Sequence, residues 1–184
     1  MEERKQLEDQ IWFTRISRTK AEKRLIDKET FIQAINIYYS LISIICSIIS
    51  FAYGDEKMGL FTIIITIGLL VSILYLNGQR YGDSARDYRK NYTELQQLEM
   101  KLKNPNADLE RIRERYCQLL NTTSNHIEFD YWRAVENASK EYKNIKGWDG
   151  IKKRLFWGKA WRLGVKIIVI ILPIIILALC EVYA

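Results

Sequence analysis

Residues 31–76 read FIQAINIYYSLISIICSIISFAY, GDEK and MGLFTIIITIGLLVSILYL, and this stretch decides the fold. The two long parts, 31–53 and 58–76, contain no charged side chain. At about 1.5 Å of rise per residue they reach roughly 34 and 28 Å as helices, close to the roughly 30 Å hydrocarbon core of a bilayer. Because backbone groups in lipid must be hydrogen-bonded within their own segment, each part is predicted to be an α-helix. The sequence therefore predicts a transmembrane helical hairpin with a short turn at 54–57.

A third apolar segment covers residues 163–180. Lys166 lies one turn from its start, where the ammonium group can extend to the interface, and Pro173 kinks a membrane helix without forbidding it. The preceding segment, 147–162, alternates basic and aromatic residues, which is typical of the head-group region. A nucleic-acid patch has a similar composition, but the position directly before an apolar segment favours lipid. The candidate membrane-interface residues are Trp148, Lys152, Lys153, Arg154, Trp157 and Trp161. We predict a third, C-terminal transmembrane helix over 163–180.

The remaining sequence is charged and has helical periodicity. Residues 1–30 are predicted to form an amphipathic cytoplasmic helix, either solvated or packed on the cytoplasmic domain or a neighbouring subunit. Residues 77–146 are predicted to be a cytoplasmic helical region, with helices near 84–103 and 107–121 and a third that follows. Helices of this size bury little core alone, so we expect docking or oligomerisation. The candidate oligomer contacts are Tyr88, Leu95 and Leu102. The predicted fold class is an all-α integral membrane protein.

Polar residues in the first span form a stripe at helical spacing. Its members are Asn36, Ser40, Ser43, Ser47 and Ser50, which step by four, three, four and three. Small hydroxyl residues let helices approach closely and hydrogen-bond across their contact. In an oligomer the same face could instead line a wettable lumen. The stripe is thus a candidate packing seam or pore lining, and neither span contains an ionisable side chain of the kind that proton relays and charge-coupled pumps require.

The charge distribution predicts the topology. Residues 1–30 carry eight Lys or Arg and residues 77–162 carry eighteen, whereas the turn 54–57 carries one. By the positive-inside rule the N-terminus and the middle region are expected in the cytoplasm, with the turn and the C-terminus outside. The formal net charge of +6 suggests contact with anionic lipid. The 22 acidic residues interleaved with the basic ones argue against direct nucleic-acid binding.

No residue pattern indicates an enzyme. The sequence has no glycine-rich phosphate loop, no nucleophile triad and no clustered carboxylate pair, so we expect no catalytic residue and no cofactor. His126 is the only histidine and the three cysteines lie far apart, so no metal site is expected. We interpret His126 as a residue that caps or packs the third cytoplasmic helix, with a pH switch involving Asp130 as the alternative.

The order of these features resembles the SLATT family of small bacterial membrane effectors, most closely its fifth subfamily. The resemblance covers about residues 20–145 and is carried by the two spans and by a series of short motifs. These motifs are Asn77-Gly78-Gln79-Arg80-Tyr81-Gly82, Ala85-Arg86, Tyr88-Arg89, Tyr92-x-x-Leu95-x-x-Leu98, Tyr116-x-x-Leu119-Leu120 and Ser124-Asn125-His126-x-x-x-Asp130-Tyr131. The third span departs from the two-span unit of that family.

The resemblance implies a function in bacterial antiphage defence by abortive infection. The implied protein is a homo-oligomeric, pore-forming effector of the inner membrane, silent until a partner sensor detects infection. The implied partners are nucleotide-signalling enzymes, nucleotide sensors or reverse transcriptases. The alternative is a membrane-anchored scaffold that recruits a soluble signalling partner and conducts nothing. A small transporter is disfavoured because the spans lack charges and the sequence lacks repeated halves.

Overall fold

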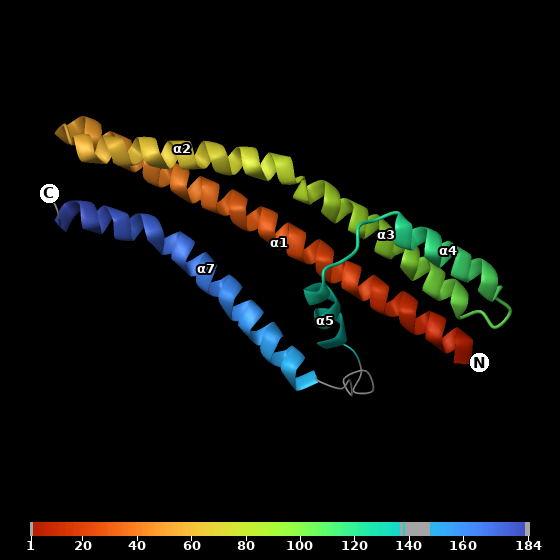
Figure 1. The fold of residues 1–184 in the computed structure, drawn as a ribbon. Helices are drawn as coiled ribbons and strands as arrows, with labels where there is room; N and C mark the ends of the chain where they lie inside the picture. The colour runs from red at the N-terminus through yellow and green to blue at the C-terminus, as the bar shows by residue number, and fades with distance from the viewer. Residues whose placement is uncertain (1, 137, 139–147, 183–184) are drawn as a thin grey trace. The chain divides into compact units, whose positions relative to one another are not determined.

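The computed structural model describes residues 2–136, 138 and 148–182, and within these every regular element is a helix. The helices are α1 (Glu2–Tyr53), α2 (Glu56–Gln79), α3 (Tyr81–Leu102), α4 (Leu109–Asn121), α5 (Glu128–Glu136) and α7 (Trp148–Val182) (Figure 1). The apolar spacing after residue 121 also predicts Tyr142 and Ile145 on the buried side of the third helix of region 77–146, and both residues lie outside the described residues. The predicted all-α fold is confirmed.

Three helical segments are long and apolar enough to cross a membrane, as the sequence predicted. They correspond to the C-terminal part of α1, to α2 and to the C-terminal part of α7. Both long helices extend beyond the predicted spans. Residues 2–30 and 31–53 form one helix of 52 residues, and residues 148–162 and 163–180 belong to one helix of 35 residues. Each of these helices therefore continues without a break where its sequence changes from charged to apolar.

Two short breaks separate α1, α2 and α3. Gly54 has a φ of +68°, a left-handed conformation that glycine adopts without steric cost, and it ends α1. Asp55 caps α2, because its carboxylate accepts hydrogen bonds from the backbone N–H groups of Lys57 and Met58. The second break is a single left-handed residue, Arg80, with a φ of 48°. The glycine-bearing exit predicted at 77–82 is therefore helical on both sides of Arg80.

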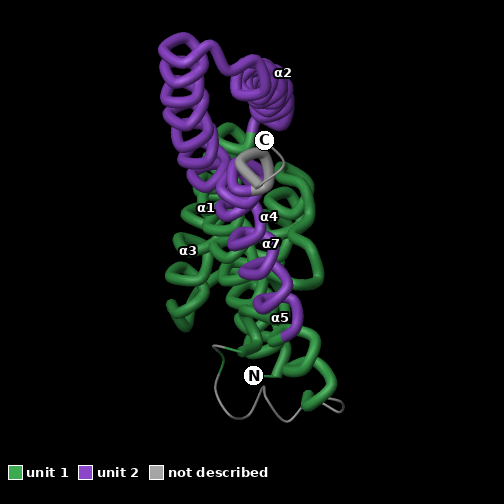
Figure 2. The backbone as a smooth tube through the Cα atoms, turned by 90° about the vertical axis from the view of Figure 1, so that its left-hand side faces the viewer, with its two compact units in different colours: residues 1–27, 81–156 green, residues 28–80, 157–184 purple. Residues whose placement is uncertain are grey.

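The chain divides into two compact units (Figure 2). The first contains residues 1–27 and 81–156, and its core joins three helices. Core residues come from the start of α1, from α3 and from α4, namely Leu7, Ile11, Leu95, Leu98, Leu102, Ile112, Tyr116 and Leu119. The N-terminal part of α1 is thus packed against α3 and α4. These contacts favour the interpretation of residues 1–30 as a helix packed on the helices that follow over that of a solvated helix.

The second unit contains residues 28–80 and 157–184 and holds the apolar helices. Cys46 of α1 packs with Phe61 and Ile65 of α2, and Leu177 of α7 lies against this cluster. The outward faces are strongly apolar: Ile37, Ile48, Ile64 and Ile168 are each between 63 and 64% exposed. A continuous apolar surface of this kind suits a lipid environment and not water.

Candidate functional site

The contact between α1 and α2 is a polar seam within the apolar hairpin. Ser72 Oγ donates a 2.8 Å hydrogen bond to Asn36 Oδ1, and the hydroxyls of Ser43 and Thr66 are 3.2 Å apart. Near the turn, Ser50 Oγ donates to the Asp55 carbonyl at 2.8 Å. Asn36, Ser43 and Ser50 are each seven residues apart, so they repeat on nearly the same side of α1.

Gly59 permits the close approach of the helices at the turn end of the seam. A Cβ atom at this position would come within 3.0 Å of Ser50 Oγ. Small residues at such contacts let two membrane helices approach closely enough for their hydroxyls to meet. The seam therefore combines a small residue with side-chain hydrogen bonds, which is a common way to hold two helices together in lipid.

The structure divides the predicted five-residue stripe. Asn36, Ser43 and Ser50 make the seam, whereas Ser40 Oγ donates within its own helix to the Asn36 carbonyl at 2.7 Å. Ser47 is exposed. Within one chain the contacts of the stripe are therefore those of helix packing. Lining of a lumen in an oligomer stays a prediction, and it would require the three seam residues to exchange partners.

The predicted interface residues lie along the first half of α7. Trp157 and Trp161 are 70% and 75% exposed, and Lys152, Lys153 and Arg154 are also exposed. The Lys152 ammonium lies 5.9 Å from the centre of the Trp148 ring. Exposed rings next to cations are what a head-group contact requires. Their role at the membrane interface stays a prediction.

The three candidate oligomer contacts lie inside the first unit. Tyr88, Leu95 and Leu102 are 4%, 0% and 2% exposed. Tyr88 Oη also donates to the Asn125 carbonyl at 3.1 Å. Side chains with so little exposed surface can contact a second copy only if the bundle opens. Within one chain, Leu95 and Leu102 pack in the core to which Leu7 and Ile11 of α1 contribute. A contact with a second copy stays a prediction.

A buried arginine is the feature that the sequence reasoning missed. Arg18 of α1 is 0% exposed. Its Nη1 atom donates to Asn91 Oδ1 and, at 3.0 Å, to the Leu119 carbonyl, and Nη2 donates to the Leu120 carbonyl at 3.3 Å. These carbonyls belong to the last turn of α4, where the helix dipole attracts a cation. Burial lowers the pKa of Arg18 from its ordinary value, and Tyr88 and Tyr116 oppose this shift.

The helical spacing of α1 could have revealed this position. Leu7, Ile11, Arg18 and Leu25 recur at intervals of four and seven residues, and all four are buried. A charged residue on the apolar face of an amphipathic helix indicates a buried polar contact. What the spacing could not supply was the partner, because Asn91 and the end of α4 are distant in the sequence.

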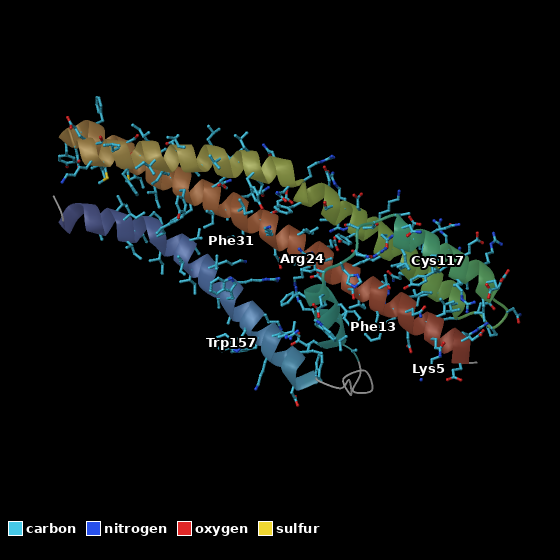
Figure 3. The ribbon with its side chains drawn as sticks, in the orientation of Figure 1. Lys5, Phe13, Arg24, Phe31, Cys117 and Trp157 are labelled. Atoms are coloured by element: carbon cyan, nitrogen blue, oxygen red, sulfur yellow. The ribbon has the colours of Figure 1, made fainter. Side chains whose placement is uncertain are left out.

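Ion pairs attach α1 to other helices of the first unit, which contains residues 1–27 and 81–156. Arg24 is 2.9 Å from the carboxylate of Asp130, Arg89 is 2.6 Å from Glu22, and Arg15 is 2.8 Å from Glu99. Phe13 and Arg24 project from α1 on the side of α5 (Figure 3), and the Phe13 ring lies 5.9 Å from that of Tyr131. The N-terminal half of α1 is thus held by charged contacts as well as by its apolar face.

His126 precedes α5 and stacks on Tyr131, with ring centres 6.3 Å apart and planes at 22°. Burial lowers its pKa, and the positive charge of Arg18 lowers it further, whereas Asp130 acts in the opposite direction. Asp130 itself pairs with Arg24, so it does not primarily orient the imidazole. Among the described residues no group of three or more His, Cys, Asp or Glu could hold a metal ion.

Comparison with known families adds a decisive observation. The family model described as "SMODS and SLOG-associating 2TM effector domain family 5", SLATT_5, matches residues 1–179. The chain belongs to this family. The resemblance seen over residues 20–145 is confirmed and extends over nearly the whole SLATT chain. A search of curated proteins and a search of solved structures each found no match.

Family membership and the apolar helices together make this SLATT chain a membrane effector of conflict systems. The matched region includes most of α7, although the family description names two transmembrane helices. A third apolar helix is therefore part of what the family model matches here, and its role has to be derived from its contacts.

Proposed function

We propose that this SLATT protein oligomerises in the bacterial inner membrane and permeabilises it when a partner sensor activates it. The observation that carries the proposal is the polar seam of the hairpin. Asn36, Ser43 and Ser50 are held by partners on α2 or at the turn, in helices whose other faces are apolar. If the hairpins of several copies rearrange, the same groups become available to wet a lumen.

The cytoplasmic unit supplies a means of control. Its core includes the first part of α1, and α1 continues without a break into the first apolar span. A partner that binds the cytoplasmic helices and shifts the contacts of Arg18, Arg24 or Glu22 would change the packing of the same helix that carries the seam. The family description, which names association with SMODS and SLOG, supports a nucleotide-signalling partner, and a reverse transcriptase is the other candidate.

The proposed topology places the N-terminus and residues 81–156 in the cytoplasm. The turn at 54–57 and the C-terminus are outside. The charge asymmetry supports this arrangement, because 26 of the 28 Lys and Arg residues lie in residues 1–30 and 77–162. A reporter active only in the cytoplasm should work when fused after Gln118 and fail after Glu56 or Ala184. Activity after Ala184 would contradict the crossing of α7.

A non-conducting scaffold is the second candidate function. One observation favours it: in the single chain the seam groups are hydrogen-bonded within the hairpin, and the outward faces are built from isoleucine and leucine. Such a hairpin anchors a soluble partner without any aqueous path. The scaffold and the pore share the same fold but differ in whether ions cross.

Dye release from vesicles distinguishes the two functions. The full chain is reconstituted in phosphatidylethanolamine–phosphatidylglycerol vesicles beside an Asp130→Asn variant, which loosens the contact between α1 and α5. The pore proposal expects leakage that rises more steeply than linearly with protein density and is greater for the variant. Absence of leakage from both proteins, with insertion verified by protease protection, would refute the pore and favour the scaffold.

A further inference from the structure

The proline within α7 leaves one backbone carbonyl without its helical donor. Pro173 has no N–H group, so it cannot donate to the carbonyl of Val169 four residues earlier. In hydrocarbon no water is present to replace the missing donor, so a neighbouring group has to supply it. Pro173 is among the fully buried residues of the chain, in a helix whose apolar face is mostly exposed. The kink therefore faces protein rather than lipid.

Two adjacent tyrosines of α1 supply the donors. Tyr39 Oη donates a 2.7 Å hydrogen bond to the Val169 carbonyl, which is the carbonyl that Pro173 leaves open. Tyr38 Oη donates to the next carbonyl, that of Ile170, at 3.2 Å. The two phenol rings meet edge to face, with centres 5.7 Å apart. Both donors come from the helix that carries the polar seam.

Contacts on both sides of the kink follow the same face of α7. Before the kink, the Lys166 ammonium lies 4.7 Å from the centre of the Phe31 ring. Phe31 belongs to α1 and is labelled in Figure 3. After it, Leu177 packs against the cluster that contains Cys46. Lys166, Val169, Ile170, Pro173 and Leu177 are spaced by one to four residues, as expected for one side of a helix. The tyrosines thus lie at the middle of the contact between α7 and the hairpin, which extends from Lys166 to Leu177.

We propose that Tyr38 and Tyr39 form a latch that holds α7 on the hairpin at the Pro173 kink, and that release of α7 from this latch permits the hairpin to open. The second half of this statement rests on the proposed permeabilising function. The latch itself does not, because it is a property of the folded chain. A hydrogen bond to a carbonyl that lacks its helical donor is specific to the kinked helix, and it can be broken without unfolding α7.

Disulfide formation measures docking without reference to permeability. The chain with Leu177→Cys, Cys117→Ser and Cys180→Ser retains Cys46 as the partner thiol, and oxidation in vesicles should join positions 46 and 177. Tyr39→Phe removes one hydroxyl and should lower the cross-linking rate by about three- to twentyfold, the range given by average and strong hydrogen bonds between membrane helices. Tyr53→Phe is the matched control, because Tyr53 lies on the same helix and is 83% exposed.

A double-variant cycle tests the mechanism. Pro173→Ala restores an N–H donor to the Val169 carbonyl, so the hydroxyl of Tyr39 is no longer required there. In the Pro173→Ala chain, Tyr39→Phe should therefore change the cross-linking rate by less than about twofold. A full effect of Tyr39→Phe in both backgrounds would show that the hydroxyl acts elsewhere and would overturn the latch, as would a wild-type cross-linking rate in Tyr39→Phe itself.

Dye release from the same vesicles then tests the control role. Tyr38→Phe/Tyr39→Phe should leak several-fold faster than wild type and Tyr53→Phe. Slower cross-linking with unchanged leakage, in a protein that does leak, would reduce the latch to an anchor and overturn its control of the hairpin. Absence of leakage from every variant, together with the expected cross-linking pattern, would refute the permeabilising function and with it the control role, while the docking by the tyrosines would stand.

Discussion

The guanidinium of Arg24 lies 2.9 Å from the carboxylate of Asp130, and the Asp130 side chain is completely buried. The two residues are 106 positions apart and join α1 to α5. An anion with no exposed surface requires its cation, since the alternative is an unpaired charge in a medium of low polarity. This pair therefore makes the position of α1 in the first unit depend on a residue of α5.

Replacing Asp130 with Asn should destabilise the first unit strongly. Removal of one partner of a buried pair costs about 3–5 kcal/mol, and the value here should lie at the lower end because Arg24 is 21% exposed. Thermal unfolding followed by circular dichroism in detergent measures the change. Asp149→Asn is the control, since Asp149 is 96% exposed and should alter stability by less than about 0.5 kcal/mol. Equal effects of the two substitutions would contradict the importance of the pair.

Arg18→Lys should be destabilising although it keeps the positive charge. The planar guanidinium reaches the Leu119 and Leu120 carbonyls and Asn91 together, whereas an ammonium group is smaller and more strongly hydrated. The expected loss is about 1–3 kcal/mol, measured by chemical unfolding in detergent. Arg86→Lys, at a side chain that is 77% exposed, should have almost no effect. An unchanged free energy of unfolding in Arg18→Lys would mean that a positive charge alone is sufficient at the end of α4.

The free energy of unfolding of the first unit should fall as the solution becomes acidic, and His126 should account for part of the fall. Burial and Arg18 hold the folded pKa of His126 below its usual value, so the neutral imidazole is favoured in the folded state. The unfolded chain binds the proton first, below a pH of about 6.5, and stability is lost from there downward. Above that pH the contribution is fully present.

The His126→Gln variant isolates this contribution from that of the carboxylates. Melting temperatures of wild type and variant should be compared at pH 7.5 and pH 5.5. The drop on acidification should be smaller in the variant, because glutamine cannot take up a proton. A drop in melting temperature of the same size in both proteins would show that His126 does not contribute to the acid sensitivity.

Ser43→Leu should weaken the hairpin, whereas Ser47→Leu should not. Ser43 is 8% exposed and its hydroxyl meets that of Thr66, so a larger side chain must displace α2. Overpacking of this kind costs about 1–3 kcal/mol. Ser47 lies on the same helix and is exposed, so it is the matched control. Titration of both variants from mild detergent into sodium dodecyl sulfate, followed by circular dichroism, measures the difference.

Leakage measured on the same two variants addresses the lumen. Loss of leakage in Ser43→Leu with an intact oligomer by light scattering would indicate a lumen, whereas a broken oligomer would indicate a seam between copies. If Ser43→Leu left hairpin stability, oligomer size and leakage all unchanged, the seam would contribute neither to packing nor to a lumen.

The apolar segments could be predicted because their signal is local. Residues 31–53, 58–76 and most of 163–180 lack charges over the length of a bilayer, and the free energy of transfer into lipid is a sum over those residues whatever they later contact. The turn at 54–57 could likewise be predicted, because only four residues separate the two uncharged segments. Helical spacing placed Asn36, Ser40, Ser43, Ser47 and Ser50 on one face, and in the structure Asn36, Ser43 and Ser50 make the seam.

Only the tertiary structure decided which partner each face meets. Periodicity placed Leu95 and Leu102 on an apolar face but could not tell that the N-terminal part of α1 covers it, so an oligomer contact was expected instead. The carbonyl that Pro173 leaves open could be inferred from the sequence, yet its donor, Tyr39, lies 130 residues from Val169. Hydrophobicity is non-directional and depends on composition, whereas hydrogen bonds and ion pairs require particular atoms to meet at defined distances. Such meetings are fixed by how the helices pack, and no local pattern contains them.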